Sequence, residues 1–460
     1  MASSGKIRTV TRWAWLVLAL WVLAGVGIIV VYRRQLAPAW SAPRAATPVV
    51  VIESDDWGLD YEPPHFVMPS PTVDTRQAAG VARLARTLAG QKDAAGRPAI
   101  AGAFIVVHQA DSAAIAADPN FAYHSLPIDR SMPQTVAALK QAAQQGVLNL
   151  VYHGRDHRDV GLWCQKIRRV VELSKEQGRS FDPEAVRTFQ PRDPIEHDRI
   201  NAEYFDSRTG YLEDLDYAAV EAKVTEGLAE FERIFGRRPV STVPPRYLWG
   251  SAAEKALAAD GIRYLHGVNK QGGRFAGADD VWSRPFGVKL DSGLIGIPRN
   301  TDVEVRPDNS LPDMATILAE ADTAAASGQP IVICAHACNF ATDGPELGEK
   351  MCDFLAQVLT NLRQRFPGLR YLSAEEAGTL AQTGEVRVRV GDDEHPVRLA
   401  GGVQQAYLAC KDIYLRRAKM RLYVQVLAAL AAATILLQAG AWRRRPKSGC
   451  ENGVASGTGE

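Results

Sequence analysis

The sequence predicts an α/β domain built from βα units around a mostly parallel sheet, with a membrane-spanning segment near each end of the chain. Short apolar runs recur along the central part, amphipathic helical patterns lie between many of them, and two terminal segments are long and apolar enough to cross a bilayer. Seven or eight strands either close into a barrel or remain an open sheet, and periodicity does not choose between these architectures. Both place chemistry at the carboxyl ends of the strands.

The candidate strands are short runs of apolar and β-branched residues. They are 49–52, 100–107, 147–152, 240–243, 262–265, 294–297, 331–335 and 369–372. The candidate helices carry apolar residues at helical spacing with polar residues between them. They are 76–88, 135–145, 217–235, 312–326 and 347–365.

Two apolar segments, 13–32 and 422–442, predict transmembrane helices. Basic residues follow the first segment and flank the second on both sides, so we expect two helices that stay in the membrane. A cleaved signal peptide is the alternative for the first, and a buried amphiphilic helix for the second. The basic tail at 1–12 favours a cytoplasmic N-terminus, which would place the central domain on the extracytoplasmic, periplasmic side of the inner membrane.

The rest of the chain divides by composition. An Ala- and Pro-rich linker occupies 33–48, and the folded α/β domain is expected over 49–380. Within it, the polar stretch 191–216 has the character of an insertion. An alternating strand-like pattern predicts a membrane-proximal hairpin or connector over 381–421, and the basic tail at 443–460 is expected to be disordered.

Composition excludes several classes of protein. A chain of 460 residues with 46% hydrophobic and 23% charged residues is typical of a folded enzyme and not of a disordered protein. A formal net charge of +1 provides no field that would gather nucleic acid. Six cysteines without paired CxxC spacing indicate neither a disulfide scaffold nor a zinc ribbon.

Two adjacent carboxylates, Asp55 and Asp56, come just after the apolar run 49–52, and Gly58 allows the chain to turn there. Neighbouring residues at a strand end point in different directions. One carboxylate can therefore bind a metal ion while the other faces the water that the metal activates. The alternative is an ordinary Asp-Asp turn.

Two histidines, His153 and His157, follow the apolar run 147–152. Their spacing of four is one helical turn, so a chain that coils there places both imidazoles on one side. With Asp56 as the third ligand they would hold a divalent ion and leave positions open for water and substrate. A histidine pair of purely structural or surface character is the alternative.

Two further strand ends carry candidate catalytic side chains. The Pro-Pro pair before Arg246 stiffens its loop and would present the guanidinium to the site, although an ordinary loop with a surface arginine is equally compatible. The run 331–335 delivers His336, and a titratable histidine near a metal suits a general acid. Alone, His336 would more often be structural.

With these motifs, residues 49–380 resemble the polysaccharide deacetylases, the NodB-homology group of the carbohydrate esterases. The likeness is greatest to a bacterial branch that carries the motif Glu-Ser-Asp-Asp-Trp-Gly, here at 53–58. The resemblance implies a distorted (β/α) barrel, Asp55 as general base and Asp56 as metal ligand. The family's pair of histidines separated by three residues corresponds to His153 and His157, which would complete the metal triad.

The resemblance also assigns the remaining roles. The family's Leu-x-x-His motif is similar to the segment that ends at His336, which would protonate the leaving amine, and Asp280 or Glu304 would support it. The family's Arg-x-Pro-Tyr motif is not reproduced in order. The sequence Pro-Arg-Tyr at 245–247 replaces it, so Arg246 would orient Asp55 and a backbone amide near Tyr247 would stabilise the oxyanion.

The predicted function is therefore metal-dependent removal of acetyl groups, chiefly N-acetyl groups of amino sugars, from a bacterial surface or exported polysaccharide. This is hydrolysis of the C–N bond of a linear amide, with zinc as the expected metal. The expected partners are an acetylated polysaccharide or oligosaccharide, the lipid bilayer and polysaccharide synthesis or export machinery. A glycoside hydrolase and a non-catalytic glycan-binding or assembly module remain as alternatives, and Trp57, Tyr247 and Trp249 are candidates for stacking on sugar rings.

Overall fold

The computed structural model describes Trp15, Leu16, Ala19, Leu23, Ala37 and residues 40–59, 73–188, 199–208, 213–272, 284–306, 308–342 and 345–416. Apart from four of these positions, the expected spans 13–32 and 422–442 lie outside the described residues. Within the described residues, none of the helices combines the length and the apolar character that a membrane span requires. Residues 38–412 form one compact unit.

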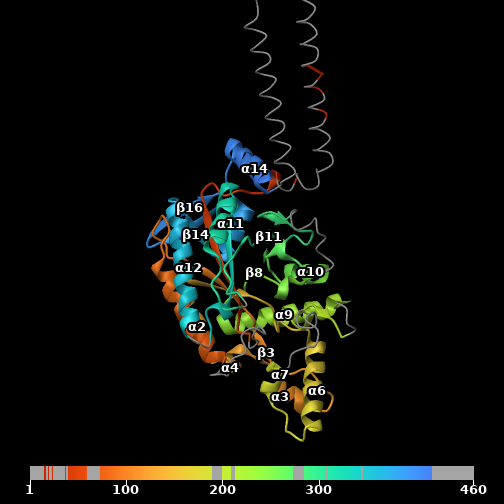
Figure 1. Cartoon of the computed structure of the whole chain (residues 1–460). Coiled ribbons are helices and arrows are strands. Elements are labelled where there is room, and N and C mark those ends of the chain that lie inside the picture. Colours follow the sequence, from red (N-terminus) through yellow and green to blue (C-terminus); the bar gives the residue numbers. More distant parts are fainter. Residues whose placement is uncertain are drawn as a thin grey trace, which may run out of the picture. The chain divides into compact units, whose positions relative to one another are not determined.

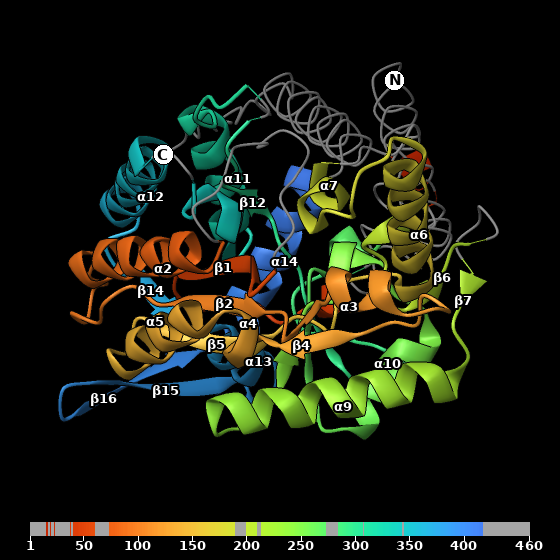
Figure 2. The same ribbon diagram turned by 90° about the horizontal axis from the view of Figure 1, so that it is seen from below.

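A mostly parallel sheet is the centre of this unit (Figures 1 and 2). In spatial order its strands are β10 (Val288–Lys289), β11 (Ile295–Ile297), β9 (Tyr264–His266), β8 (Ser241–Thr242), β5 (Leu148–Tyr152), β2 (Ala101–Ile105), β1 (Val49–Trp57), β13 (Ile331–His336) and β12 (Thr301–Asp302). The short strand β14 (Arg370–Leu372) also pairs with β1. Among the described residues of this sheet, β10 alone pairs antiparallel, with β11.

The predicted α/β class with a parallel sheet is thus confirmed, and each of the eight expected strands is present. In the part of the chain that the structure describes, no pairing joins β10 to β12, so the hydrogen-bonded sheet is not closed into a barrel there.

Helices cover the sheet and supply one side of its core. The longer ones are α2 (Val73–Gly90), α5 (Pro133–Gln144), α6 (Val160–Glu176), α9 (Tyr217–Phe235), α10 (Ser251–Ala259), α11 (Met314–Ala326), α12 (Pro345–Arg365), α13 (Ala374–Thr383) and α14 (Gly402–Arg416). Helix α2 packs against α5 and α12, and α9 against α10 (Figures 1 and 2). The five helices expected from periodicity are all present.

Four of these longer helices were not expected, namely α6, α10, α13 and α14, and local features explain the first three. Asp159 caps α6 by accepting from the Leu162 amide. Ser373 and Glu376 form a reciprocal capping box at the start of α13. The alanine-rich α10 has too few large apolar residues to show a clear amphipathic pattern.

The sheet is buried on both faces, as parallel sheets usually are. Alternate residues of the central strands, such as Val50 and Ile52, pack with the outer helices in the largest core cluster. The opposite face of the same strands packs in a second cluster with α13 and the hairpin formed by β15 (Glu385–Val390) and β16 (Asp393–Arg398). The hairpin expected near this position therefore contributes apolar side chains to the second cluster.

The second face changes from apolar to polar along the strands, and this change creates the site. Because side chains alternate along a strand, one face of β1 and β13 carries every second residue. On this face lie Val49, Val51, Glu53 and Asp55 of β1, and Val332, Cys334 and His336 of β13. The parallel register sets Glu53 opposite Cys334 and Asp55 opposite His336. The carboxyl ends of both strands therefore deliver titratable groups to one place.

Candidate active site

Asp56 reaches the site because the ladder is interrupted at the end of β1. The pairing of β1 with β2 shifts register between Ser54 and Trp57, and Asp56 has a left-handed backbone with φ 67°. A bulge of this kind re-aims a side chain and is common beside active sites. It allows the two adjacent aspartates, Asp55 and Asp56, to lie near the same histidines.

The histidines lie on an irregular turn and not on a helix, which corrects the expectation that the chain coils there. Residues 153–159 contain no helical residue, and α6 begins at Val160. Gly154 has φ 94°, and His157 is left-handed with φ 53°. The buried Glu203 holds this turn by accepting from the amides of Arg155 at 2.8 Å and His157 at 3.1 Å.

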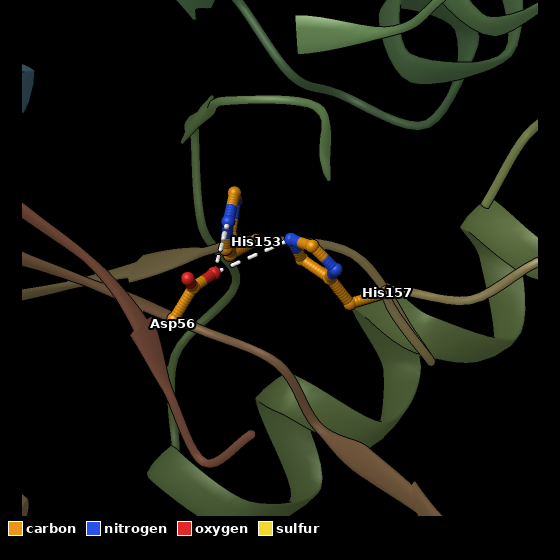
Figure 3. A group of neighbouring side chains, drawn as sticks. All are labelled: Asp56, His153 and His157. Atoms are coloured by element: carbon orange, nitrogen blue, oxygen red, sulfur yellow. Dashed lines mark hydrogen bonds and ion pairs between the residues drawn. The ribbon is translucent and has the colours of Figure 1, made fainter. Parts of the chain in front are cut away.

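Asp56, His153 and His157 converge as the sequence predicted (Figure 3). The Oδ1 atom of Asp56 lies 3.1 Å from Nε2 of His153 and 3.3 Å from Nε2 of His157. The edge of a tetrahedron around zinc, with bonds of 2.0–2.1 Å, is about 3.3 Å. The spacing therefore fits three ligands of one divalent ion.

The hydrogen bonds of His153 support this assignment. Its Nδ1 lies 2.7 Å from the carbonyl oxygen of Val243, so Nδ1 carries the proton and donates it. The lone pair of Nε2 then faces the Asp56 carboxylate, and two acceptors at this distance repel one another unless a cation or a proton lies between them. Carbonyl oxygens that hold the second nitrogen of a histidine are typical of metal sites.

The charges of the cluster suit a metal site in the same way. Burial would raise the pKa of Asp56, but the neighbouring His157 and the hydrogen bonds to both imidazoles hold this pKa well below its ordinary value. At His157 burial prevails and lowers the pKa. The pKa of His153 is raised because Asp55 and Asp56 outweigh its burial. Asp56 and His157 therefore have the protonation states that metal binding requires, whereas an ion would have to displace a proton from His153.

Asp55 is held by Arg299. The guanidinium donates from NH1 to Oδ2 at 2.5 Å and from NH2 to Oδ1 at 2.7 Å. Burial alone would raise the pKa of Asp55, but the charge of Arg299 overcomes it and lowers this pKa. Asp55 is thus an ionised carboxylate in a fixed orientation.

The partner of Asp55 is therefore Arg299, whereas Arg246 was the expected one. Arg246 is exposed, in a turn where it and Tyr247 both have left-handed backbones. The amide of Tyr247 donates to the carbonyl of Pro244, and the next amide, of Leu248, donates to that of Pro245. These two amides are engaged within the turn and are not available to an oxyanion.

Arg299 was missed, although a signal was present. It comes two residues after β11, at the same carboxyl edge of the sheet that supplied the other candidates. It also lies at the centre of a buried network. Its Nε donates to Glu53 at 2.5 Å, and the other oxygen of Glu53 lies 2.6 Å from Nδ1 of His266. Glu53, His266 and Arg299 are almost fully buried. Glu53 and His266 therefore fix Arg299, which in turn fixes Asp55.

His336 pairs with Glu304, one of the two carboxylates considered from sequence. Its Nδ1 lies 2.6 Å from Oε1 of Glu304, and Asn339 donates to the other oxygen of that carboxylate, also at 2.6 Å. Burial would lower the pKa of His336, but Glu304 and Asp56 raise it well above the ordinary value. Asp280 lies outside the described residues.

The candidate aromatic platforms are mostly core residues. Trp57 and Trp249 are fully buried, and their indole nitrogens donate to Ser54 and Glu254. Tyr247 is partly buried, and its hydroxyl accepts from Arg299 at 2.8 Å. Stacking of a sugar on either tryptophan is therefore excluded.

The site thus contains three groups with complementary chemistry: a cluster able to hold a divalent ion, an ionised carboxylate and an imidazole that retains its proton. A divalent ion in the cluster would add a Lewis acid to a base and an acid at one edge of the sheet. This combination is suited to hydrolysis.

No protein-family model matches the chain, and no curated protein matches it either. Several solved structures are similar to this chain. One is a putative polysaccharide deacetylase from Mycobacterium smegmatis, which is 14% identical with a TM-score of 0.42; the match covers 74% of this chain and 94% of that chain. A family 4 acetyl xylan esterase from Clostridium thermocellum in complex with a cobalt ion is 10% identical, with a TM-score of 0.30 over 72% of this chain and 91% of that one. A 4-alpha-glucanotransferase from Thermococcus litoralis is 9% identical, with a TM-score of 0.37 over 73% and 40%. Similarity at this level does not identify an activity.

Proposed function

We propose that this protein is a metal-dependent hydrolase that removes acetyl groups from the amino sugars of a polysaccharide. One observation carries the proposal: an Arg299-bound carboxylate, Asp55, and a Glu304-bound imidazole, His336, lie on neighbouring strands beside a three-ligand cluster. Amide hydrolysis needs this division of labour, with a base for water and an acid for the leaving amine.

Asp56, His153 and His157 would hold the metal ion, and zinc is the candidate because oxygen and nitrogen ligands with open positions suit a catalytic zinc site. When bound, such an ion polarises the acetyl carbonyl and lowers the pKa of water.

Asp55 removes a proton from the attacking water. Arg299 fixes both carboxylate oxygens, so the base is oriented before substrate arrives. The water oxygen bonds to the acetyl carbon, and the C–N bond then breaks. Asp55 is ionised throughout the neutral range, because its pKa is lowered.

His336 donates its proton to the departing nitrogen, so that the products are acetate and a free amine. The raised pKa of this histidine keeps it protonated until the C–N bond breaks, and Glu304 fixes its ring through Nδ1. The proton to be donated is therefore on Nε2. This arrangement favours an amide substrate, whose leaving group must be protonated.

The proposal also includes the setting expected from sequence. The substrate is a polymer at the bacterial surface or in export, and the domain lies on the extracytoplasmic side, anchored through 13–32 and 422–442. A distorted barrel of the NodB type, and contact with synthesis or export machinery, belong to the same proposal.

The test measures metal content and acetate release by the purified full-length chain on N-acetylglucosamine oligomers and on O-acetylated xylan. We expect about one tightly held metal ion per chain and acetate release that chelation abolishes. Asp55→Asn should keep the ion and lose about 10²–10⁴-fold in rate. His153→Ala should lose both the ion and the activity.

Two matched controls separate chemistry from folding. Asp308→Asn changes an exposed aspartate, and His395→Ala changes a histidine of the β15–β16 hairpin, and both should retain the ion and the activity. A native chain without metal would refute the triad. Metal without acetate release from any glycan would favour the binding or assembly module, and metal-independent release of reducing ends would favour a glycoside hydrolase.

A further inference from the structure

Cys334 has no role in the proposed hydrolysis, yet its thiol lies among the catalytic side chains. It precedes His336 by two residues on β13, so both side chains project from the same face of the sheet. Glu304 follows β12, and the register of β12 with β13 sets Asp302 opposite Cys334. Strand alternation therefore brings a thiol, an imidazole and a carboxylate together.

The ligand atoms of Glu304, Cys334 and His336 lie within 4.8 Å of one another. Ligand atoms of a tetrahedral zinc site that includes sulfur are about 3.3–3.8 Å apart, so small side-chain rotations would complete the geometry. The Nδ1 of His336 and Oε1 of Glu304 already share a proton at 2.6 Å. A metal ion would enter in place of that proton.

Burial raises the pKa of the Cys334 thiol, so the sulfur keeps its proton until an ion displaces it, and two donors could then stabilise the thiolate. The hydroxyl of Tyr247 lies 3.4 Å and the NH1 of Arg299 lies 3.6 Å from its Sγ, and both can donate to a thiolate. Two cations are near, but each is already paired, since Arg299 binds two carboxylates and Lys270 binds Asp302. Their repulsion of an incoming cation is therefore largely compensated.

We propose that Glu304, Cys334 and His336 form a second metal site, with one thiolate, one imidazole and one carboxylate ligand, which takes a zinc-class divalent ion. This ion would release the proton between His336 and Glu304 and the proton of the thiol. Resting on the proposed function, the inference has a regulatory consequence: with the ion on Nδ1, His336 is a neutral imidazole, and its Nε2 proton is too weakly acidic to protonate the leaving amine. Metal in excess of one equivalent therefore inhibits the enzyme.

Cobalt distinguishes the two sites, because only the second contains sulfur. The experiment titrates Co²⁺ into the metal-free full-length chain and follows both the ions bound and the thiolate-to-cobalt charge-transfer absorption in the near ultraviolet. We expect two ions per chain, with this absorption growing as the second ion binds. One ion per chain, or two without the absorption, would overturn the second site.

Variants assign the ligands. Cys334→Ala should lose the absorption and lower the affinity for the second ion by more than about 100-fold. Residues that only support a metal ligand already contribute about 10–100-fold to metal affinity, and a ligand itself should contribute more. It should keep the first ion, which also shows that the variant is folded. Cys352→Ser, in a buried cysteine of α12, should keep both ions and the absorption. Loss of the absorption in Cys338→Ser but not in Cys334→Ala would exclude Cys334 as the ligand.

Glu304→Gln provides a second route if Cys334→Ala fails to fold, and it should also lose the second ion. Acetate release is measured separately. Excess Zn²⁺ should slow the native chain and leave Cys334→Ala unaffected. Cobalt–thiolate absorption without acetate release from any substrate would refute the hydrolase while leaving the metal site in place. Acetate release without the absorption would refute the metal site alone.

Discussion

Arg299 is the residue through which the buried charges of the site are connected. It donates to Glu53 and to both oxygens of Asp55, and His266 approaches Glu53 from the other side. Removing one partner of such a buried ion pair typically costs about 3–5 kcal/mol, because the remaining charge is left without compensation. The orientation of Asp55 therefore depends on residues that do not touch substrate.

Glu53 should make the free energy of unfolding depend on pH in the acid range. Burial would raise its pKa, but His266 and Arg299 outweigh burial and hold it below the ordinary 4.5. A carboxyl group whose pKa is lower in the folded state than in the unfolded state stabilises the fold at pH values above 4.5. This stabilisation is lost as the pH falls from 4.5 through the lower pKa of the folded state. Glu53→Gln should lower the unfolding midpoint near neutral pH and make its decline below pH 4.5 less steep.

Thermal unfolding of the full-length chain across that pH range tests this expectation. The control is Glu349→Gln, which changes an exposed partner of Arg86 and should leave the acid dependence as it is. Parallel curves for the native chain and Glu53→Gln would show that Glu53 does not carry the acid dependence.

At the scale of elements, the turn between β5 and α6 positions the two histidines of the proposed metal site. Gly154 has φ 94°, and a Cβ there would overlap Oε2 of Glu203 and approach Cγ of Pro245 to 2.9 Å. Gly154→Ala should therefore displace Glu203, release the amides of Arg155 and His157, and weaken metal binding by at least about tenfold, as loss of an outer partner does. The metal dissociation constant measures this.

Gly146 is the matched control, because its φ of 74° is also left-handed but a Cβ there would meet nothing within 4 Å. Gly146→Ala should cost about 1–2 kcal/mol of backbone strain and leave metal affinity unchanged. Equal metal affinities of the two variants would contradict the assigned role of Glu203.

The strands and the convergence of Asp56, His153 and His157 were predictable because one rule covers them: an apolar run is followed by polar residues at the carboxyl edge of a parallel sheet. The supporting residues are harder to recognise, although Arg299 also follows a strand at this edge. Glu203 lies in the polar stretch 191–216, which has no periodicity, and Arg299 follows a run of only three strand residues. Their partners are far away in sequence, so only the fold brings them together. Bulges and left-handed turns, as at Asp56, also leave no clear pattern in the sequence.

At the scale of the whole compact unit, its two ends are joined. Arg44 is fully buried and donates to Asp412 of α14 at 2.9 Å and to the carbonyl of Ser327 at 2.7 Å. The amide of Ala46 also donates to the carbonyl of Arg398 in the hairpin. Residues 38–48 and 385–412 are therefore part of the folded unit, beyond what periodicity over 49–380 indicated.

Asp412→Ala should consequently destabilise the full-length chain by about 3–5 kcal/mol, because it removes the carboxylate to which the buried Arg44 donates. Chemical denaturation measures the change. Glu349→Ala, which removes an exposed partner of Arg86, should have little or no effect. An Asp412→Ala chain as stable as the native one would mean that Arg44 is neutralised by other groups.

The pairing of Val50 with Ile331 determines in which order parts of the site are completed during synthesis on the ribosome. At about 5–20 residues per second, the ribosome makes His157 roughly 10–40 s before His336. The three ligands of the first cluster are thus complete while one edge of β1 still lacks β13. Under the proposed function, a nascent chain would contain all three candidate metal ligands before it contains the proposed acid His336 or the Glu304–Cys334–His336 cluster.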